Sequence, residues 1–104
     1  VTLQFFLNYV EFGMNIQEAL NAPTVSSMHF PSSFYPRNSQ PGHLAAESRI
    51  SPEVITDLEN RGHKVQITDA WGSGKALAIR YDKSNEIILG GASPRREIGY
   101  AIGW

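Results

Sequence analysis

The sequence predicts a mixed α+β protein, with helices in its first part and strands dominating its second half. Near the N-terminus, Leu3, Phe6 and Leu7 recur at the spacing of a buried helical face. In the second half, residues 64–68 and 76–81 alternate between apolar and polar side chains, as half-buried strands do. The 104-residue length is enough for one small domain.

The first predicted element is a pair of helices within residues 2–22. The first of them is apolar on most of its circumference, so it needs cover from more than one side. Val1 is not a capping residue, and no Ser, Thr, Asp or Asn precedes it. We therefore expect the sequence to begin inside a larger structure. Gly13 is expected to end this helix.

The second helix has clear start and stop signals. Asn15 and Glu18 form a capping box, and Pro23 ends the helix because the residue before a proline is steered out of the helical region. Residues 24–43 then hold several prolines and no periodicity. Loops of this length are uncommon in compact domains, and this one is rich in aromatic residues. We therefore predict an ordered loop over 24–43 that packs on a surface.

The best-marked element is a helix over residues 51–61. Ser51 is its N-cap, Pro52 occupies the first helical position, and Gly62 ends it. One side of this helix should be buried through Val54, Ile55 and Leu58. A short strand is expected at 44–48, before the helix. The strand at 64–68 follows it, with Val65 and Ile67 facing inward.

The last predicted elements form a hairpin. Residues 76–81 place Leu77, Ile79 and Tyr81 on one face, and residues 82–85 make a polar loop. Residues 86–89 return as a more continuously apolar partner, which predicts a central strand. The Gly90-Gly91 pair that follows permits a close backbone approach or a bulge.

Composition excludes several classes of function. The net charge of -1 and the absence of a basic stripe argue against nucleic acid as a partner. No cysteine is present, so there is no thiolate metal site. The first helix is too short to span a bilayer, and it lacks the basic start of a signal peptide. We expect no cofactor and no membrane partner, and the sequence does not fix the compartment.

Two candidate catalytic patterns fail on inspection. Gly74-Lys75 follows a glycine-rich turn, but Asp69 and Ala76 stand where a phosphate-binding loop needs Gly and Ser or Thr. A plain turn with a solvated lysine is the better interpretation. The serines at 32, 33 and 73 lack the framing of a nucleophile elbow.

Two further clusters each have a functional and a structural interpretation. His29, His43 and His63 with Glu47 match no metal-ligand spacing, so we predict no metal site. Arg95-Arg96 is the most suggestive polar cluster. It is either a carboxylate-binding fork or an anchor in which Arg95 pins the tail to a carbonyl or an acid, and we favour the anchor. No complete active site is predicted, and no residue is assigned a catalytic, cofactor or metal role.

Several stretches, taken together, resemble the γ-glutamyltranspeptidase family. They are NYVEFGMNIQEALNAP, PSSFYP, ESRISPEVITDLENRGHKV, DAWGSGKALAIRYD and GGASPRREIGYAIGW, in order over nearly all of the chain. PSSFYP looks like a γ-glutamyltransferase-like branch of that family. The resemblance identifies residues 1–104 with the C-terminal part of the small subunit.

The resemblance implies an N-terminal-nucleophile hydrolase, a four-layer αββα sandwich of which this chain is an incomplete C-terminal piece. In the family, self-cleavage exposes a threonine that attacks a γ-glutamyl amide such as that of glutathione, and a Gly-Gly turn stabilises the oxyanion. Both lie upstream of the matched region, and neither Val1 nor Thr2 can act as the nucleophile. The chain alone is therefore expected to be inactive, with the large subunit and the rest of the small subunit as its partners.

Two rival hypotheses stay open. One is a non-catalytic scaffold or interaction module that keeps the fold and has lost the nucleophile. The other is an amide acylase of the same superfamily. Thr24 stands where many members have Arg, and Ser93 stands where the better-known transpeptidases have Asp, so the γ-glutamyl specificity does not follow from the matched residues alone.

Overall fold

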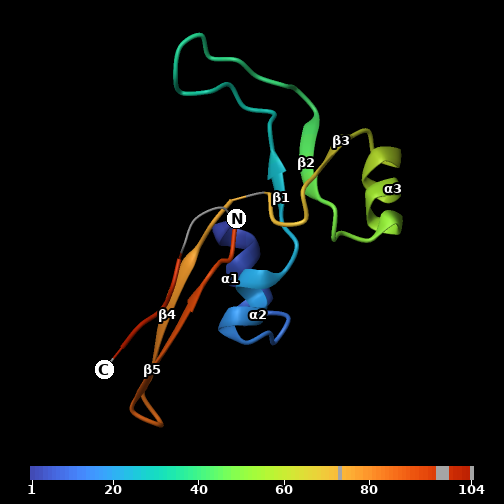
Figure 1. Cartoon of the computed structure of the whole chain (residues 1–104). Coiled ribbons are helices and arrows are strands. Elements are labelled where there is room, and N and C mark those ends of the chain that lie inside the picture. The colour runs from blue at the N-terminus through green and yellow to red at the C-terminus, as the bar shows by residue number, and fades with distance from the viewer. Residues whose placement is uncertain (73, 96–98, 104) are drawn as a thin grey trace. The chain divides into compact units, whose positions relative to one another are not determined.

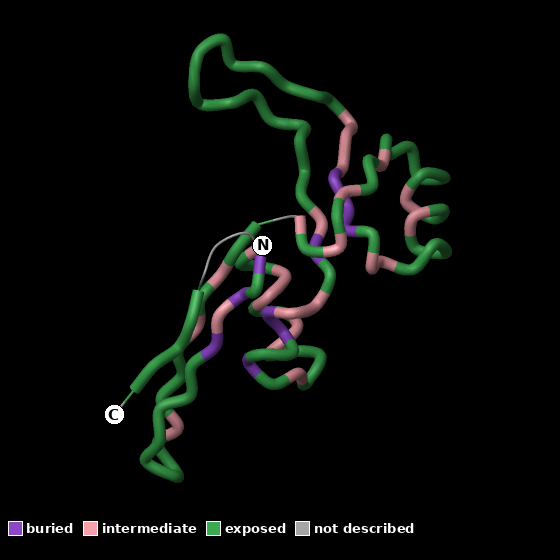
Figure 2. Tube along the Cα trace, in the orientation of Figure 1, coloured by how far each residue is buried: buried purple, intermediate pink, exposed green. Residues whose placement is uncertain are grey.

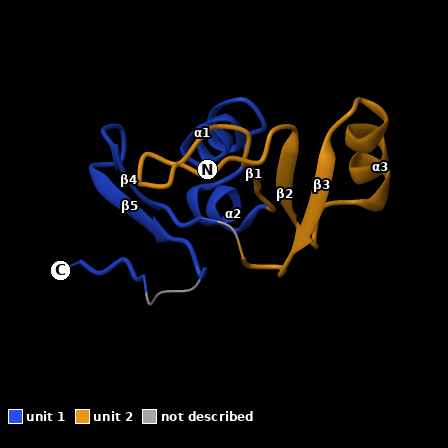
Figure 3. Ribbon diagram, turned by 90° about the horizontal axis from the view of Figure 1, so that it is seen from above, with its two compact units in different colours: residues 1–22, 74–104 blue, residues 23–73 orange. Residues whose placement is uncertain are grey.

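The computed structural model describes residues 1–72, 74–95 and 99–103. Its elements, in chain order, are α1 (Thr2–Val10), α2 (Ile16–Asn21), β1 (Val25–Ser27), β2 (His43–Glu47), α3 (Pro52–Asn60), β3 (Lys64–Thr68), β4 (Leu77–Asp82) and β5 (Ile87–Ala92) (Figure 1). The chain divides into two compact units (Figure 3). Unit 1 comprises Val1–Ala22 and Gly74–Trp104, and unit 2 comprises Pro23–Ser73.

Unit 1 is built on a hairpin of β4 and β5 that is backed by α2. The strands pair antiparallel from Leu77 opposite Ala92 to Asp82 opposite Ile87. Helix α2 begins at the cap that the sequence predicts: the Asn15 side chain accepts a hydrogen bond from the Glu18 N–H at 2.9 Å. The three buried residues of α2, namely Ile16, Ala19 and Leu20, form the apolar core of the unit.

The Gly90-Gly91 pair allows close packing on both faces of β5. A Cβ on Gly91 would lie 2.6 Å from Cγ2 of Ile16 and 2.8 Å from Cδ1 of Leu20, so α2 rests directly on the backbone there. A Cβ on Gly90 would lie 3.0 Å from Cβ of Ala101, which belongs to the tail. Since successive residues of a strand face opposite sides, each glycine serves one neighbour. The register is unbroken through both, so the alternative of a bulge is wrong.

The turn of the hairpin is closed by Asp82. Its carboxylate accepts hydrogen bonds from the backbone N–H groups of Ser84 and Asn85, at 3.1 and 3.4 Å, and from Nδ2 of Asn85 at 2.9 Å. The Asn85 side chain is the main cause that lowers the pKa of Asp82 below its usual value. Glu86, the last residue of the turn, has a φ of 53°.

Helix α1 is shorter than predicted, and its apolar face is less buried than predicted. It ends at Val10 rather than at Gly13, although Gly13 does adopt the left-handed conformation, with a φ of 70°. The predicted buried face is exposed: the accessible fraction is 69% for Leu3 and 56% for Phe6. The described residues supply no layer over that face (Figure 2).

Unit 2 is a three-stranded sheet in the order β1-β2-β3, with α3 connecting β2 to β3. Strand β1 is antiparallel to β2, and β2 is parallel to β3. The segment predicted as a loop over 24–43 therefore contains a strand at Val25–Ser27 and ends where β2 begins. The core of this unit lies at Ala45 and Ala46 of the central strand.

Helix α3 forms from the signals in its sequence. Oγ of Ser51 accepts a hydrogen bond from the Val54 N–H at 3.4 Å, and Pro52 occupies the first turn. At the other end, Gly62 has a φ of 98°. The N–H of Gly62 donates to the carbonyl of Glu59 and that of His63 to the carbonyl of Leu58, which is the pattern of a Schellman motif.

Two further predictions of burial are wrong for the described residues. Val54 of α3 is 49% exposed and Ile67 of β3 is 53% exposed. In the hairpin, Ile79 shares a face with Leu77 and Tyr81 as predicted, but it is 81% exposed. Strand β5 is also not central among the described residues, because it pairs only with β4.

Within the described ranges, no helix is long and apolar enough to cross a membrane.

Candidate functional site

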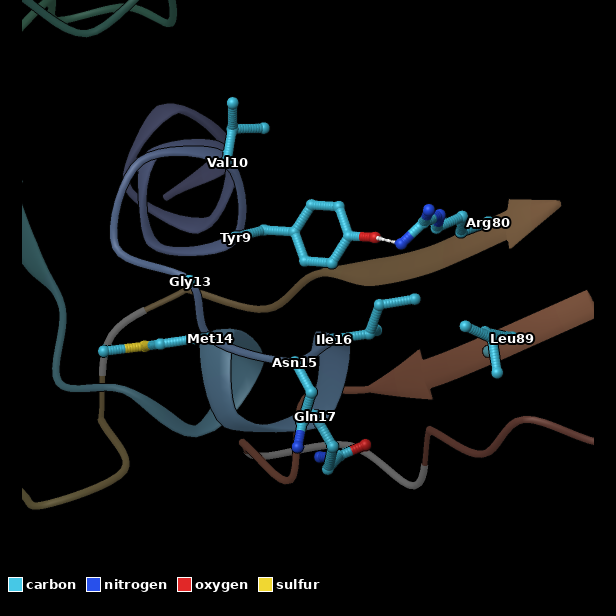
Figure 4. A pocket seen from close by; sticks show the side chains of 10 residues that line it. Tyr9, Val10, Gly13, Met14, Asn15, Ile16, Gln17, Arg80 and Leu89 are labelled. Atoms are coloured by element: carbon cyan, nitrogen blue, oxygen red, sulfur yellow. Dashed lines mark hydrogen bonds between the residues drawn. The ribbon is translucent and has the colours of Figure 1, made fainter. Parts of the chain in front are cut away.

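Unit 1 contains an open cleft of about 820 Å³ between the two helices and the hairpin (Figure 4). Its lining is largely apolar and comes from the end of α1, the start of α2, and both strands of the hairpin. The residues that line it are Tyr9, Val10, Gly13, Met14, Asn15, Ile16, Gln17, Arg80, Leu89 and Gly90.

A tyrosine and an arginine face each other across this cleft. Arg80 of β4 donates a hydrogen bond from its guanidinium to the Tyr9 hydroxyl, and the two side chains point toward one another in Figure 4. The guanidinium carbon also lies 5.7 Å from the centre of the Tyr9 ring. Because Arg80 is exposed and no carboxylate is among the lining residues, the cleft carries a positive charge.

This cleft can bind, but its described lining holds no catalytic pair. A nucleophile needs a base within hydrogen-bond reach, and the lining side chains offer only a phenol, two amides, a guanidinium and apolar groups. Sequence reasoning did not find the pair of Tyr9 and Arg80. The two residues are 71 positions apart, and no local pattern in the sequence pairs them.

Arg95 is a structural anchor. Its side chain is 1% exposed and donates to the carbonyls of Leu20 at 2.6 Å and Ala22 at 2.7 Å, and to Oγ of Ser93 at 3.1 Å. A guanidinium committed to the C-terminal carbonyls of α2 is not a fork for a free carboxylate. The anchor interpretation is therefore confirmed, and the fork hypothesis is wrong for Arg95. Arg96 lies outside the described residues.

The Glu47 carboxylate also has a structural role. It is completely buried and accepts hydrogen bonds from the Thr24 N–H at 2.8 Å, from Oγ1 of Thr24 at 3.2 Å, and from Arg49 at 3.3 Å. Arg49 in turn donates to the carbonyl of Ala70 at 2.7 Å and stacks 3.6 Å above the ring of Trp71. These bonds connect the start of β1 and the segment that follows β3 to the end of β2.

The three histidines do not converge. Nδ1 of His29 accepts a hydrogen bond from the Gly42 N–H at 3.0 Å, inside the loop that joins β1 to β2. His43 and His63 line a shallow cleft of about 540 Å³ in unit 2, together with Glu59. In the part of the chain that the structure describes, no three His, Cys, Asp or Glu side chains are placed to hold a metal ion.

The remaining candidates have structural roles or fall outside the description. Oγ of Ser32 accepts a hydrogen bond from the Phe34 N–H at 3.2 Å, as in a local turn. Gly74 has a φ of 69° and lies against Val1, where an added Cβ would overlap Cγ2 of that residue. Ser73, between the two glycines of the turn, is not among the described residues.

Comparison with known proteins matches the whole chain. A family model described as Gamma-glutamyltranspeptidase covers residues 1–104. The glutathione hydrolase proenzyme of Escherichia coli (strain K12) is 29% identical over 93 residues, which are 89% of this chain and 14% of that protein. This chain therefore spans about a seventh of that relative.

Solved structures share the fold. The structure of LmbA2991HD is 36% identical with a TM-score of 0.90, over 99% of this chain and 19% of that one. A cephalosporin acylase from Bacillus halodurans is 26% identical with a TM-score of 0.71, over 90% of this chain and 16% of that one. A γ-glutamyltranspeptidase from Pseudomonas nitroreducens is 18% identical with a TM-score of 0.67, over 98% of this chain and 48% of that one.

The fold class is α+β, and the fold is shared with part of the chains of solved γ-glutamyltranspeptidases. The chain belongs to the γ-glutamyltranspeptidase family.

Proposed function

We propose that this chain is the C-terminal segment of the small subunit of an enzyme that hydrolyses or transfers γ-glutamyl groups. The observation that carries the proposal is the match of all 104 residues to the γ-glutamyltranspeptidase family. The likeness to a protein named glutathione hydrolase proenzyme favours a glutathione-type substrate. The nucleophile and the oxyanion turn belong to the parent protein outside this sequence.

In the proposed reaction, the threonine hydroxyl forms an ester with the γ-carbonyl carbon while the γ-amide bond breaks. The threonine α-amine takes the hydroxyl proton and passes it to the leaving amine. Water or an acceptor amine then attacks the ester, which regenerates the hydroxyl. No residue of this chain touches the reacting atoms in this scheme, and its contribution is the scaffold beneath them.

The scaffold role is supported by faces that the described residues leave uncovered. The outward face of α1 carries Leu3, Phe6, Leu7 and Val10, all more than a third exposed. The face of the hairpin that carries Ile79, Tyr81 and Ile88 is exposed as well. Apolar faces of this kind are typical of interfaces rather than of free surface. We propose that the large subunit and the rest of the small subunit cover them.

The test is the turnover of a γ-glutamyl anilide by the full-length protein. The mass and the N-terminal sequence of the purified subunits identify the threonine at the self-cleavage junction. Replacing that threonine by alanine should abolish both cleavage and turnover, whereas serine should keep part of each because it retains a hydroxyl. An uncleaved, inactive wild-type protein without a junction threonine would instead support a non-catalytic module.

A second candidate is an amide acylase with another acyl group. The likeness to a structure named cephalosporin acylase favours it. The two activities separate in a panel of anilides that differ only in the acyl part, γ-glutamyl against glutaryl and aliphatic acyl groups. The γ-glutamyl compound is the only one of these with an α-amino group. A preference for glutaryl anilide would make the acylase the better description.

A further inference from the structure

Tyr9 and Arg80 form a pair of hydrogen-bond donors in the cleft of unit 1, and most of their donors are unused. One N–H of Arg80 donates to the Tyr9 hydroxyl, and the guanidinium makes no other hydrogen bond among the described residues. Since a guanidinium carries five N–H donors, the others remain open. The Tyr9 hydroxyl accepts from Arg80, and its own proton meets no acceptor among the described residues. Both side chains of this donor pair can therefore still donate to a ligand.

Asp82, an acid on the same strand, is committed to the turn of the hairpin. It lies two positions after Arg80, so the two side chains share a face of β4. Hydrogen bonding by Asn85 is the main cause that lowers the pKa of Asp82, and the charge of Arg80 contributes least. These two described side chains form no ion pair, and no Asp or Glu lines the cleft. An anion in the cleft would therefore meet donors and no competing carboxylate.

The lining beside the donor pair is apolar. Val10, Ile16 and Leu89 line the same cleft, and Leu89 is the register partner of Arg80 across the hairpin (Figure 4). The amides of Asn15 and Gln17 are already hydrogen-bonded within unit 1. The volume of about 820 Å³ falls in the range of small-molecule sites, roughly 300–1,000 Å³, which combine a mostly apolar lining with a few fixed polar groups. The cleft has both features.

We propose that this cleft binds a small carboxylic acid with an apolar body. The carboxylate accepts hydrogen bonds from the guanidinium of Arg80 and from the Tyr9 hydroxyl, and the apolar body lies against Val10, Ile16 and Leu89. The guanidinium carbon is 5.7 Å from the centre of the Tyr9 ring, a contact that orders the donors before the ligand binds and so lowers the cost of binding. Binding of this kind needs no nucleophile, so the inference goes beyond the proposed function and does not depend on it.

Binding of hydrocinnamate to the full-length protein tests the proposal. Hydrocinnamate has a carboxylate on a phenylethyl body and no amide bond, so it is not a substrate of the proposed reaction. Calorimetry should give a Kd on the order of 1 mM or tighter, and salt should weaken the binding because it screens the exposed guanidinium. Hydrocinnamamide, which has the same body without the charge, should bind at least about tenfold more weakly. Equal affinities would overturn the proposal. So would a protein that hydrocinnamate does not saturate, the result expected if an acidic side chain of the parent fills the cleft.

Variants of the donor pair locate the site. Arg80→Gln should weaken hydrocinnamate binding about tenfold to a hundredfold, and Tyr9→Phe by a smaller factor because it removes only a neutral donor. Arg80→Lys keeps the charge but not the fork, so its affinity should lie between those of the wild type and Arg80→Gln. Arg61→Gln is the matched control, because Arg61 is 70% exposed and ion-paired with Asp57, and its affinity should not change.

An unchanged affinity in Arg80→Gln would overturn the proposal. Turnover of γ-glutamyl anilide is measured on the same samples. An inactive protein that binds hydrocinnamate through Arg80 would count against the proposed function alone.

Discussion

Single buried side chains join distant parts of each unit. Arg95 connects the tail to the last carbonyls of α2, and Glu47 connects the start of β1 to the end of β2. A helix leaves its final carbonyls without internal partners, so a cation at that point satisfies both hydrogen bonding and the helix dipole. The sequence predicted an anchoring role for Arg95. It could not predict the acceptors, because they lie more than 70 positions away.

Replacing this anchor should be costly. The Arg95→Met variant keeps much of the side-chain volume but leaves the carbonyls of Leu20 and Ala22 without their charged donor. Hydrogen bonds to charged groups contribute about 1.5–3 kcal/mol each, and they are not additive. We therefore expect the free energy of unfolding to fall by about 2–4 kcal/mol. The free energy of unfolding of Arg95→Lys should fall between those of the wild type and Arg95→Met, because one ammonium cannot match the fork of a guanidinium. Urea unfolding followed by circular dichroism measures the change.

An exposed arginine provides the matched control. Arg61 forms an ion pair with Asp57 at 2.8 Å, but the two side chains are 70% and 60% exposed. An exposed pair contributes about 0–1 kcal/mol, so Arg61→Met should shift the unfolding midpoint little. Equal shifts for the two variants would show that Arg95 does not anchor the tail.

At the scale of elements, local signals predicted the helices better than the pairing of strands. The caps at Asn15 and Ser51 and the glycine at position 62 are local, and each acts where the sequence places it. Strand β1 is only three residues long and has no alternation of its own. Its existence depends on pairing with β2, which lies beyond a long loop. The parallel pairing of β2 with β3 is likewise a non-local choice that periodicity cannot report.

The contact of α2 with β5 makes a sharp prediction at Gly91. An added Cβ would lie within 2.8 Å of both Ile16 and Leu20, closer than side chains tolerate. Gly91→Ala should therefore destabilise unit 1 by about 1–3 kcal/mol, through displacement of α2. Gly103→Ala is the control, since nothing lies within 4 Å of a Cβ there.

A double-mutant cycle separates a steric clash from loss of backbone freedom. Ile16→Ala removes the nearer of the two clashing groups, so the cost of Gly91→Ala should be smaller in that background than in the wild type. Urea unfolding of the four proteins gives the coupling energy. Strict additivity would mean that α2 does not press on Gly91.

For the whole molecule, periodicity predicted which residues share a face but not whether the face is covered. Leu3, Phe6, Leu7 and Val10 lie on one side of α1 as expected, yet that side is exposed. A hydrophobic pattern records that burial is needed, whereas the layer that provides it comes from another part of the fold. The cleft with Arg80 shows the same limit, because its walls come from segments far apart in the sequence.

The uncovered faces predict how the 104-residue chain behaves when it is expressed alone. Exposed apolar residues on α1 and on the hairpin should make it bind an apolar dye such as ANS strongly and associate in solution, because contiguous apolar surface of this kind favours contact over hydration. It should show no turnover of γ-glutamyl anilide. Fluorescence and light scattering, with the full-length protein as the control, measure the first two properties. A monomeric chain that leaves the dye dark would show that these faces are not interfaces, and turnover by the chain alone would place the chemistry within it.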